Sequence, residues 1–166
     1  MDFRFTIPSI KVLESKINTM SYRIGFGTDF HQLVDGRALW IGGVEIPHHK
    51  GALGHSDADV LLHAICDAML GALALGDIGM HFPDSDPRWR GAESGQFVRH
   101  AMQLIGERGL RVVNTDVTLL AQAPRIGPYR GRMIESLSTL LGLPPDRVNI
   151  KATTTERLGF IGRGEG

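Results

Sequence analysis

The stretch GHSDADVLLHAICDAMLG at 54–71 restricts the possible fold more than any other part of the sequence, because ionisable residues interrupt an otherwise apolar helix pattern. We expect a helix over 58–75, in which only Asp59, His63 and Asp67 are neither apolar nor glycine. Their i, i+4, i+8 spacing puts them on one helix face. A face selected for helix stability would carry Lys, Glu, Gln or Arg in place of Asp and His. The stripe therefore indicates a functional face, with an ordinary solvated face as the alternative.

A second acid–histidine pair lies in GTDFHQL at 27–33, where polar and apolar residues alternate as in a strand. Asp29 and His31 are two residues apart, so a strand presents both on one face. If a helix packs there, His63 can join them. One carboxylate and two imidazoles with an open fourth position are the ligands of a catalytic zinc ion, or of non-haem iron. Asp67 is expected to accept a hydrogen bond from the other imidazole nitrogen of His63. A solvated strand edge is the alternative.

Three further segments suggest a phosphorylated ligand. GHS at 54–56 precedes the N-terminus of the expected helix, where free N–H groups and the helix dipole favour anions. KATTTE at 151–156 offers hydroxyl groups for phosphate oxygens and a carboxylate of the kind that serves Mg²⁺, although threonine is also common in edge strands. GRGEG at 162–166 is either a flexible tail or a backbone anion site. Together these segments are typical of a metal-assisted phosphoryl site without a Walker-type loop.

Composition argues against several other classes of protein. Lys and Arg number 18, as do Asp and Glu, so no excess of positive charge favours nucleic acid as a partner. No apolar run reaches the roughly 18–20 residues of a membrane span, so we expect no membrane partner. The single cysteine, Cys66, lies in an apolar run, which predicts a buried, unreactive thiol. Residues 1–20 resemble neither a signal nor a transit peptide; we expect an N-terminal extension outside the fold, or a translation start at Met20.

The remainder, 21–166, is expected to form a single small α+β domain, with a mixed or antiparallel sheet of about four strands and three helices on one face. Ser56 or Asp57 can cap the first helix, and Gly76 follows its end. The segment 76–93 is expected to be a long polar loop, and loops of that length are usually functional or disordered. The other expected elements are strands at 22–33, 38–47 (after an Asp-Gly hairpin turn, and broken by a glycine pair), 110–122 and 147–154, and helices at 94–108 and 129–141.

From Tyr22 to Gly166 the chain resembles the 2-C-methyl-D-erythritol 2,4-cyclodiphosphate synthase family, which belongs to the non-mevalonate route to isoprenoids. Six segments in the family's order carry the resemblance: RIGFGTDFH, IGGVEIP, GHSDADVLLHAICDAMLGALALGDIG, FPDSDP, DVTLLAQAPR and VNIKATTTERLGFIGRGEG. The resemblance implies a cytoplasmic homotrimer with active sites between neighbouring subunits. It also implies that the 2-phosphate of 4-diphosphocytidyl-2-C-methyl-D-erythritol 2-phosphate attacks the β-phosphate, so that CMP leaves and the cyclic diphosphate forms.

The same resemblance implies roles for individual residues. Zn²⁺ is held by Asp29, His31 and His63, and a second divalent ion, Mg²⁺ or Mn²⁺, by Glu156. The transition state is stabilised by His55 and Thr154, and phosphate is contacted by Ser56. The methylerythritol pocket comprises Asp77, Ile78, Gly79, Phe82, Pro83, Asp84, Ser85 and Asp86. The cytidine side, from the neighbouring subunit, comprises Ala121, Gln122, Ala123, Pro124, Arg125, Ile126 and Gly127 with Thr153, Thr154 and Thr155; the substrate phosphates and the trimer axis lie near Phe160 and Arg163.

The chain departs from the family pattern in its nucleotide loop and at its C-terminus. Arg125 stands where lysine is common, and Gly127 where a larger apolar residue is common. Family members continue through another strand beyond the position of Gly166, so we expect a C-terminal strand to be missing from this sequence. Two other functions are compatible with the scaffold: a metal-dependent phosphohydrolase acting on nucleotide diphosphates, and a non-catalytic trimer that binds isoprenoid diphosphates.

Overall fold

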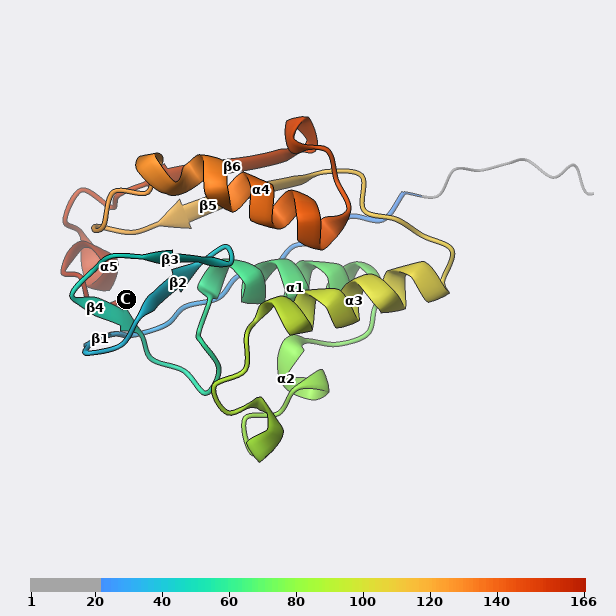
Figure 1. The fold of residues 1–166 in the computed structure, drawn as a ribbon, viewed down its shortest axis with the longest axis horizontal. Coiled ribbons are helices and arrows are strands. Elements are labelled where there is room, and N and C mark those ends of the chain that lie inside the picture. The colour runs from blue at the N-terminus through green and yellow to red at the C-terminus, as the bar shows by residue number, and fades with distance from the viewer. Residues whose placement is uncertain (1–21) are drawn as a thin grey trace, which may run out of the picture.

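The computed structural model describes residues 22–166, and the expected N-terminal extension at 1–20 lies outside the described residues. The described part of the chain is a small α+β domain, as expected (Figure 1). Its strands are β1 (Leu33–Asp35), β2 (Leu39–Ile41), β3 (Val44–Ile46), β4 (Lys50–Ala52), β5 (Thr115–Leu120) and β6 (Val148–Thr153). Its α-helices are α1 (Val60–Ala72), α2 (Ile78–His81), α3 (Gly95–Glu107), α4 (Arg130–Leu141) and α5 (Gly159–Gly162). Short 3₁₀ turns occur at Pro87–Trp89, Gly127–Tyr129 and Pro145–Arg147.

The strands of residues 22–166 form three separate two-stranded sheets, so the prediction of one four-stranded sheet is wrong for this structure. β1 pairs antiparallel with β4, β2 pairs antiparallel with β3, and β5 pairs in parallel with β6. The reason is that the expected strand 22–33 has ladder partners only from Leu33 onward, and the stretch 22–32 has no strand pairing. Without that strand, nothing joins the three pairs into one sheet.

A glycine pair, and not the Asp-Gly dipeptide, makes the tight hairpin turn. Gly42 and Gly43 join β2 to β3 and have φ angles of +63° and +73°, as a two-residue type I′ turn requires. Asp35 and Gly36 lead from β1 toward β2, but β1 pairs with β4. A turn sequence predicts a change of direction, whereas the choice of pairing partner depends on contacts distant in sequence.

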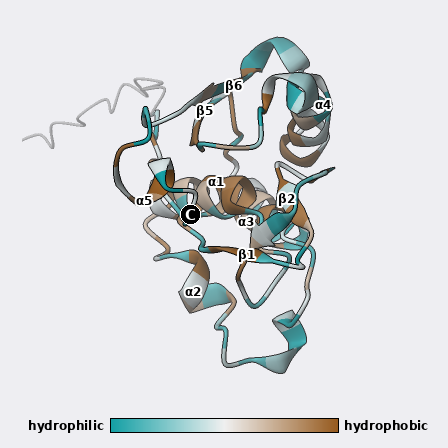
Figure 2. Cartoon of the chain, turned by 90° about the vertical axis from the view of Figure 1, so that its left-hand side faces the viewer, coloured by the Kyte–Doolittle hydropathy of each residue, from teal (hydrophilic) through white to brown (hydrophobic). Residues whose placement is uncertain are grey.

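The three expected helices are confirmed as α1, α3 and α4, with ends that differ from the expected ones by up to three residues. α3 packs against both α1 and α4, and α4 also packs against β6. α1 lies near the centre of the molecule, where Figure 2 shows its apolar residues. Its Leu61, Leu62, Cys66 and Leu70 are almost fully buried, which confirms the expected buried thiol. No helix of residues 22–166 combines the length and the hydropathy that crossing a membrane requires.

α1 begins later than expected because Asp59 is its N-cap. The fully buried Asp59 accepts a hydrogen bond from the backbone N–H of Leu62 at 3.1 Å through Oδ1. Its carboxylate also accepts hydrogen bonds from the backbone N–H groups of Gly42 (2.8 Å) and Gly43 (2.6 Å). The predicted cap at 56–57 is therefore wrong, and Asp59 does not belong to the functional stripe. Its carboxylate fastens the start of α1 to the β2–β3 turn.

The extended segment 22–32 lies directly on the backbone of α1. A Cβ atom at Gly25 would be 1.8 Å from the carbonyl oxygen of Ala68, and one at Gly27 would be 2.1 Å from that of Ala64. Only glycine, which has no Cβ, allows two backbones to approach so closely. The side of the segment that carries these glycines therefore faces α1.

The opposite side of this segment is exposed, and a large cavity lies beside it. The side chains of Ile24 and Phe26 are 92% and 84% exposed. The cavity, of about 1330 Å³, is lined by 22–31, by 109–123 and by apolar side chains of α1 that include Ile65 and Met69. Two segments far apart in the sequence thus form the walls of one apolar cavity.

Candidate metal centre and adjoining cavity

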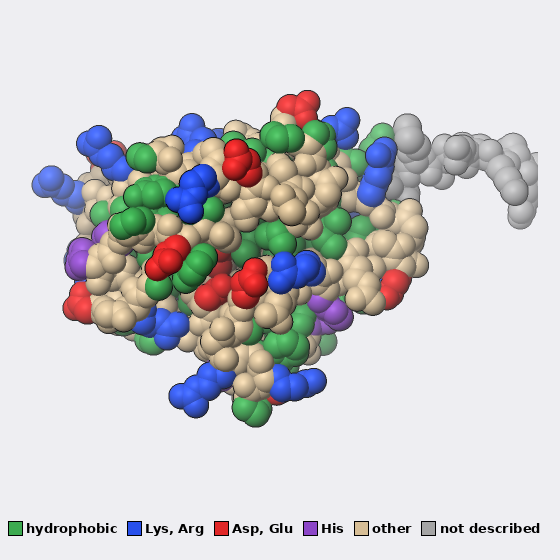
Figure 3. Space-filling view, in the orientation of Figure 1, with side chains coloured by type: hydrophobic (Ala, Val, Ile, Leu, Met, Phe, Trp, Pro, Cys, Tyr) green, Lys and Arg blue, Asp and Glu red, His purple; other side chains and the backbone are tan. Residues whose placement is uncertain are grey.

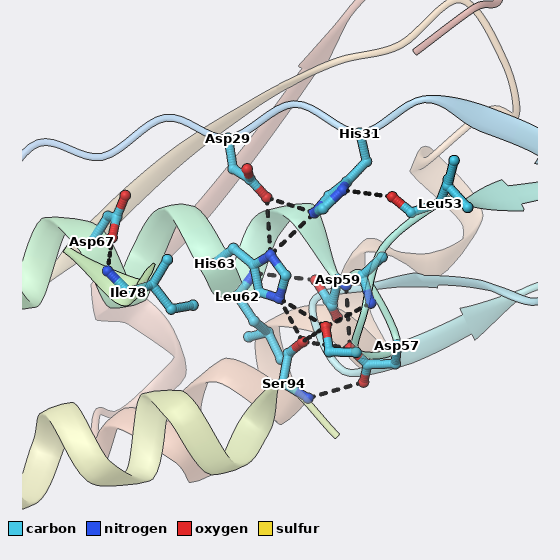
Figure 4. Close-up of polar contacts among 12 residues, drawn as sticks. Asp29, His31, Leu53, Asp57, Asp59, Leu62, His63, Asp67, Ile78 and Ser94 are labelled. Carbon is cyan, nitrogen blue, oxygen red and sulfur yellow. Dashed lines mark hydrogen bonds and ion pairs between the residues drawn. The ribbon is translucent and has the colours of Figure 1, made fainter. Parts of the chain in front are cut away.

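Asp29, His31 and His63 lie together, as the sequence predicts (Figure 4). Asp29 Oδ2 is 2.9 Å from His31 Nε2 and 3.0 Å from His63 Nδ1, and the two nitrogens are 3.1 Å apart. Ligand atoms at about 2.0–2.1 Å from a tetrahedral zinc ion lie about 3.3 Å from one another. The three atoms therefore form nearly the triangle that such an ion requires. Their side chains are 25%, 18% and 12% exposed, respectively, so the centre is accessible from solvent.

The ionisation of Asp29 and His31 also suits a cation. His31 Nδ1 is 2.9 Å from the carbonyl oxygen of Leu53, which only accepts, so the neutral ring carries its proton on Nδ1 and a lone pair on Nε2. The hydrogen bond with Asp29 raises the pKa of His31. Burial raises the pKa of Asp29, but hydrogen bonds with His31 and His63 outweigh burial and hold that pKa well below its ordinary value. Asp29 is thus an anion at neutral pH, beside two imidazoles.

The expected hydrogen bond between Asp67 and His63 does not form. Asp67 Oδ1 accepts a hydrogen bond from the backbone N–H of Ile78 at 2.7 Å, which joins α1 to the start of α2. His63 Nε2 lies instead 2.8 Å from Ser94 Oγ and 3.2 Å from Ser56 Oγ. The i, i+4 spacing places Asp67 and His63 on one face, but it does not fix the direction of the imidazole ring, which points toward the start of α3 (Figure 4).

Some of the donors near the anion site expected just before the first helix are engaged within the chain. Ser56 is 5% exposed, and its Oγ accepts a hydrogen bond from the backbone N–H of Ala58. The backbone N–H of Asp57 donates to Ala92 O, and that of Asp59 donates to Asp57 Oδ1. Because the Asp59 carboxylate already caps α1, a phosphate group would have to be bound by other donors at 54–56, and the expected anion site stays a prediction.

A cavity of about 450 Å³ opens beside the triad. His31 belongs to the triad and also lines this cavity. The cavity brings together eight residues to which the sequence analysis assigned a role in binding: His31, His55, Ser56, Ile78, Gly79, Phe82, Pro83 and Asp84. Trp89 and Phe97, which had no assigned role, complete the wall. The Phe82 ring lies 5.0 Å from Trp89 and 4.5 Å from Phe97, measured between centroids. The segment 76–93 therefore contributes one face of a pocket with an aromatic side.

Three residues assigned to the same pocket do not line it, and two of them have local structural roles. Asp77 caps α2, since its Oδ1 accepts from the backbone N–H of Met80 at 2.9 Å. Asp86 accepts from the backbone N–H of Arg88 at 3.0 Å and forms an exposed ion pair with that side chain at 2.6 Å. Ser85 is exposed. In this structure the two carboxylates therefore cap the N-termini of short helical turns and do not line the cavity.

The residues assigned to the cytidine side form a second group, where the parallel strands β5 and β6 end. The backbone N–H of Ala121 donates to Thr153 O at 3.1 Å, and that of Arg157 donates to Gln122 Oε1 at 3.2 Å. Ile126 is buried, and the loop then enters the 3₁₀ turn at Gly127–Tyr129. The structure thus brings together the loops that follow β5 and β6, both of which the sequence analysis assigned to the cytidine side.

Glu156 and Thr154 belong to this second group and not to the metal triad. Thr154 Oγ1 donates to Glu156 Oε1 at 2.9 Å, and both residues are exposed. Thr155 Oγ1 donates to the carbonyl oxygen of Leu158 at 2.7 Å. Within residues 22–166, the cluster of potential metal ligands consists of the triad, without Glu156, and no residue after 97 lines the smaller cavity. The smaller cavity and the second group therefore share no residue, although Asp29 and His31 of the triad and 121–123 of the second group all line the larger cavity.

Phe160 and Arg163 lie at the C-terminal end of the described chain. The Phe160 ring makes an edge-on contact with Phe30, with centroids 6.0 Å apart. Arg163 Nε is 2.6 Å from Glu165 Oε1 in an exposed ion pair. The backbone N–H of Leu33 donates to Glu165 O at 2.8 Å, so the segment 162–166 is attached to β1 and is not a loose tail.

Two residues behind His63 were not assigned to the site from the sequence. Ser94 is fully buried, and its Oγ is the nearest oxygen to His63 Nε2. Asp57, considered only as a helix cap, accepts hydrogen bonds from both the hydroxyl and the backbone N–H of Ser94. A serine just before a helix usually indicates an N-cap, so no local signal distinguishes this serine from an ordinary cap.

Comparisons with known proteins agree with this geometry. The model of the YgbB family matches residues 22–166. The 2-C-methyl-D-erythritol 2,4-cyclodiphosphate synthase of Dechloromonas aromatica (strain RCB) is 59% identical over 146 residues, which cover 88% of this chain and 91% of that protein. A bifunctional enzyme IspD/IspF of Novosphingobium aromaticivorans is 54% identical over 93% of this chain but only 40% of its own length. The match to that longer protein therefore concerns one part of it.

A solved structure shows the same fold. The structure of a 2C-methyl-D-erythritol-2,4-cyclodiphosphate synthase in a CDP-bound form has a TM-score of 0.77 and 47% sequence identity, and the match covers 81% of this chain and 89% of that chain. A family match over all described residues, together with majority identity to a curated relative over nearly its whole length, identifies the family. The chain belongs to the YgbB family, the family of the 2-C-methyl-D-erythritol 2,4-cyclodiphosphate synthases.

Proposed function

We propose that this chain converts 4-diphosphocytidyl-2-C-methyl-D-erythritol 2-phosphate to 2-C-methyl-D-erythritol 2,4-cyclodiphosphate and CMP, as a lyase of isoprenoid precursor biosynthesis. The observation that carries the proposal is the triangle of Asp29, His31 and His63, because its His31 also lines the smaller cavity, of about 450 Å³. The names of the relatives give the product, and the CDP-bound relative supports a cytidine diphosphate substrate.

The reaction requires little covalent chemistry from the protein. An oxygen of the 2-phosphate forms a bond to the β-phosphorus, the bond from that phosphorus to the oxygen bridging the α-phosphate breaks, and CMP leaves with this oxygen. No water is consumed. Because nucleophile and electrophile belong to one substrate, holding them in contact supplies much of the rate enhancement. The aromatic wall of Phe82, Trp89 and Phe97 would exclude water, while His55 at the rim would donate a hydrogen bond to the developing charge.

The donor set of the triad fits Zn²⁺, since two imidazoles and one carboxylate leave a fourth position for a phosphate oxygen. A bound divalent ion would neutralise phosphate charge that otherwise repels the attacking group. Glu156, exposed beside Thr154, would serve a second ion, Mg²⁺ or Mn²⁺, because a hard cation prefers carboxylate oxygen. We place the residues that hold zinc and those that hold the nucleotide in different subunits of a cytoplasmic homotrimer. Within residues 22–166, the smaller cavity contains no residue of the nucleotide group and the triad does not include Glu156, which supports this arrangement.

Phosphorus NMR tests the proposal. The purified protein is incubated with the substrate, Zn²⁺ and Mg²⁺, and the spectrum is followed with time. The expected result is that the signal of the substrate's 2-phosphate disappears while equimolar cyclic diphosphate and CMP form, and CMP gives a monoester signal of its own. A linear product with water incorporated, traced with ¹⁸O-labelled water, would indicate a phosphohydrolase instead. Binding without turnover would indicate a non-catalytic trimer, and either outcome would contradict the proposal.

A further inference from the structure

A hydrogen-bonded chain runs from the interior to the candidate metal centre (Figure 4). His63 Nδ1 faces Asp29, and its Nε2 lies 2.8 Å from Ser94 Oγ. The hydroxyl of Ser94 donates to Asp57 Oδ1, and the backbone N–H of Ser94 donates to Asp57 Oδ2 at 3.0 Å. Ser94 is fully buried. Asp57 therefore holds the serine by two hydrogen bonds, and the serine contacts the imidazole.

The direction of the protons in this chain follows from the chemistry of its members. An ionised carboxylate has no proton to donate, so the hydroxyl proton of Ser94 points to Asp57. The same oxygen can then only accept from His63. In the neutral imidazole the proton consequently lies on Nε2, and Nδ1 presents its lone pair to Asp29 and His31. A metal ligand must present such a lone pair.

The side chain of Ser94 does not cap its own helix, although its position predicts that it would. It occupies the N-cap of α3, where a serine side chain usually accepts a hydrogen bond from the backbone of its own helix. The structure shows no side-chain capping bond there, because the hydroxyl turns to Asp57 and His63. The start of α3 thus lacks its usual side-chain cap, while the imidazole gains a fixed partner.

Ser56 does not replace this contact. Its Oγ is 3.2 Å from His63 Nε2, compared with 2.8 Å for Ser94, and it already accepts from the backbone of Ala58. It is also 3.4 Å from Ser94 Oγ, near the limit of a hydrogen bond.

From these contacts we propose that Asp57 and Ser94 are positioning residues for the metal centre. They fix the Nε2–H tautomer and the ring orientation of His63, so that Nδ1 is prepared to ligate a divalent cation before the cation arrives. The proposal rests on the proposed metal site, but the tautomer belongs to the metal-free protein and is measured without metal. Partners of this kind behind a metal-bound histidine typically change metal affinity by 10–100-fold.

Three variants test the proposal. Ser94→Ala removes the acceptor, Ser94→Thr retains a hydroxyl at the same position, and Ser138→Ala is the matched control, since Ser138 Oγ is buried without a hydrogen-bond partner. Long-range ¹H–¹⁵N NMR of the metal-free proteins reports the His63 tautomer, with the signal assigned by its loss in His63→Ala. Competition with a chromogenic chelator reports the Zn²⁺ dissociation constant.

In the wild type we expect a proton on Nε2 of His63. In Ser94→Ala we expect a mixed tautomer and a Zn²⁺ affinity about 10–100-fold weaker, with both properties largely restored in Ser94→Thr and unchanged in Ser138→Ala. A wild-type proton on Nδ1 overturns the proposal even if Ser94→Ala does not fold. A folded Ser94→Ala protein with wild-type tautomer and affinity overturns it as well. If the wild-type protein binds no zinc but has the proton on Nε2 of His63, the proposed zinc site is wrong. The metal-positioning role is then overturned as well, while the tautomer assignment stands.

Discussion

Two histidines present different ring nitrogens to one carboxylate oxygen. His31 directs Nε2 toward Asp29 because a backbone carbonyl holds its Nδ1, while His63 directs Nδ1 because a hydroxyl holds its Nε2. Asp-x-His spacing predicts that Asp29 and His31 share a face, which the structure confirms. No spacing rule predicts which nitrogen faces inward, because the partners that decide it, Leu53 and Ser94, lie in other segments.

Replacing His63 with alanine removes one corner of the triangle. We expect His63→Ala to lose bound zinc and to lower the rate of cyclic diphosphate formation by more than about 100-fold, because a direct ligand matters more than the 10–100-fold of a supporting partner. The fold should persist, since His63 is not part of the hydrophobic core cluster of the described residues. Metal analysis, the phosphorus NMR assay and far-UV circular dichroism check these outcomes.

The control for this variant is His49→Ala, which removes an exposed imidazole outside the triad. It should keep both zinc and activity. Full zinc occupancy in His63→Ala would remove His63 from the ligand set.

Protons compete with zinc at His31. Its pKa in the metal-free protein is raised above 6.5 by the hydrogen bond with Asp29, so this interaction stabilises the metal-free fold fully below pH 6.5 and is lost as pH rises through the raised pKa. Zinc requires the deprotonated ring. The increase in Tm on adding zinc should therefore be larger at about pH 8 than at about pH 6. Asp29 does not interfere in this range, since its pKa lies well below the ordinary value.

Thermal unfolding with and without zinc, at constant ionic strength, measures this dependence. His63→Ala serves as the reference that lacks the site. An increment that is the same at both pH values would show that His31 does not exchange a proton for the metal.

At the scale of elements, glycines on the segment 22–32 place the metal ligands. Gly27→Ala would put a Cβ 2.1 Å from the carbonyl oxygen of Ala64 and 2.7 Å from the backbone nitrogen of Ala68. Because neither backbone atom can move alone, the segment must shift away from α1 and take Asp29 with it. We expect zinc affinity to fall at least about 10-fold, together with a lower Tm.

Gly106→Ala in α3 is the matched control, since a Cβ there meets no atom within 4 Å. It should leave zinc affinity unchanged and stabilise the helix by up to about 1 kcal/mol. Unchanged zinc affinity in Gly27→Ala would show that the segment 22–32 can move without loss of the ligand geometry.

The buried Asp59 carboxylate connects α1 to the β2–β3 turn. Burial raises its pKa, while hydrogen bonds from the backbone N–H groups of Gly43, Gly42 and Leu62 act in the opposite direction. Asp59→Ala would leave three donors without their acceptor, at a cost of about 1–3 kcal/mol for each one that water cannot reach. We expect the free energy of unfolding to fall by about 3 kcal/mol or more, as measured by urea titration.

Asp77→Ala is the comparison, since Asp77 caps only the short, exposed helix α2. Its loss should cost about 1 kcal/mol. Equal effects of the two substitutions would show that Asp59 acts as an ordinary cap and does not fasten two elements together.

The sequence predicted the helices better than the sheet. The apolar periodicity of α1, α3 and α4 is a local signal, so it located all three helices. The N-cap of α1 was predicted wrongly because Asp59 is held there by hydrogen bonds from Gly42 and Gly43, which are distant in sequence. The strand predicted from the alternation in 22–33 is wrong for 22–32, but the expected proximity of Asp29 and His31 is confirmed. The alternation could not predict that no strand would pair with residues 22–32, because pairing depends on what lies next to the segment.

At the scale of the whole molecule, the surface in Figure 3 shows acidic and basic side chains interspersed, which matches the equal numbers of both in the sequence. The apolar cavity of about 1330 Å³ between 22–31 and 109–123 is the main departure from a closed core. The prediction of a further C-terminal strand stays a prediction. Assembly also remains a prediction, since family motifs name residues without showing which subunit supplies them.

Mixing two inactive variants distinguishes a shared site from a site within one chain. His63→Ala disables the metal half-site, and Glu156→Gln disables the half-site beside Thr154 and Gln122. The two variants are refolded together at equal amounts, so that trimers form from random combinations of subunits. If each active site combines one half from each of two neighbouring subunits, each half is intact with a probability of about one half. About one site in four is then intact. Recovery of about a quarter of the wild-type rate in the phosphorus NMR assay is therefore expected after mixing.

The variants refolded separately and then mixed, without exchange of subunits, should stay inactive. If both halves of a site belong to the same chain, no combination of these subunits restores it, and co-refolded protein that is trimeric by light scattering but inactive would contradict the shared-site arrangement.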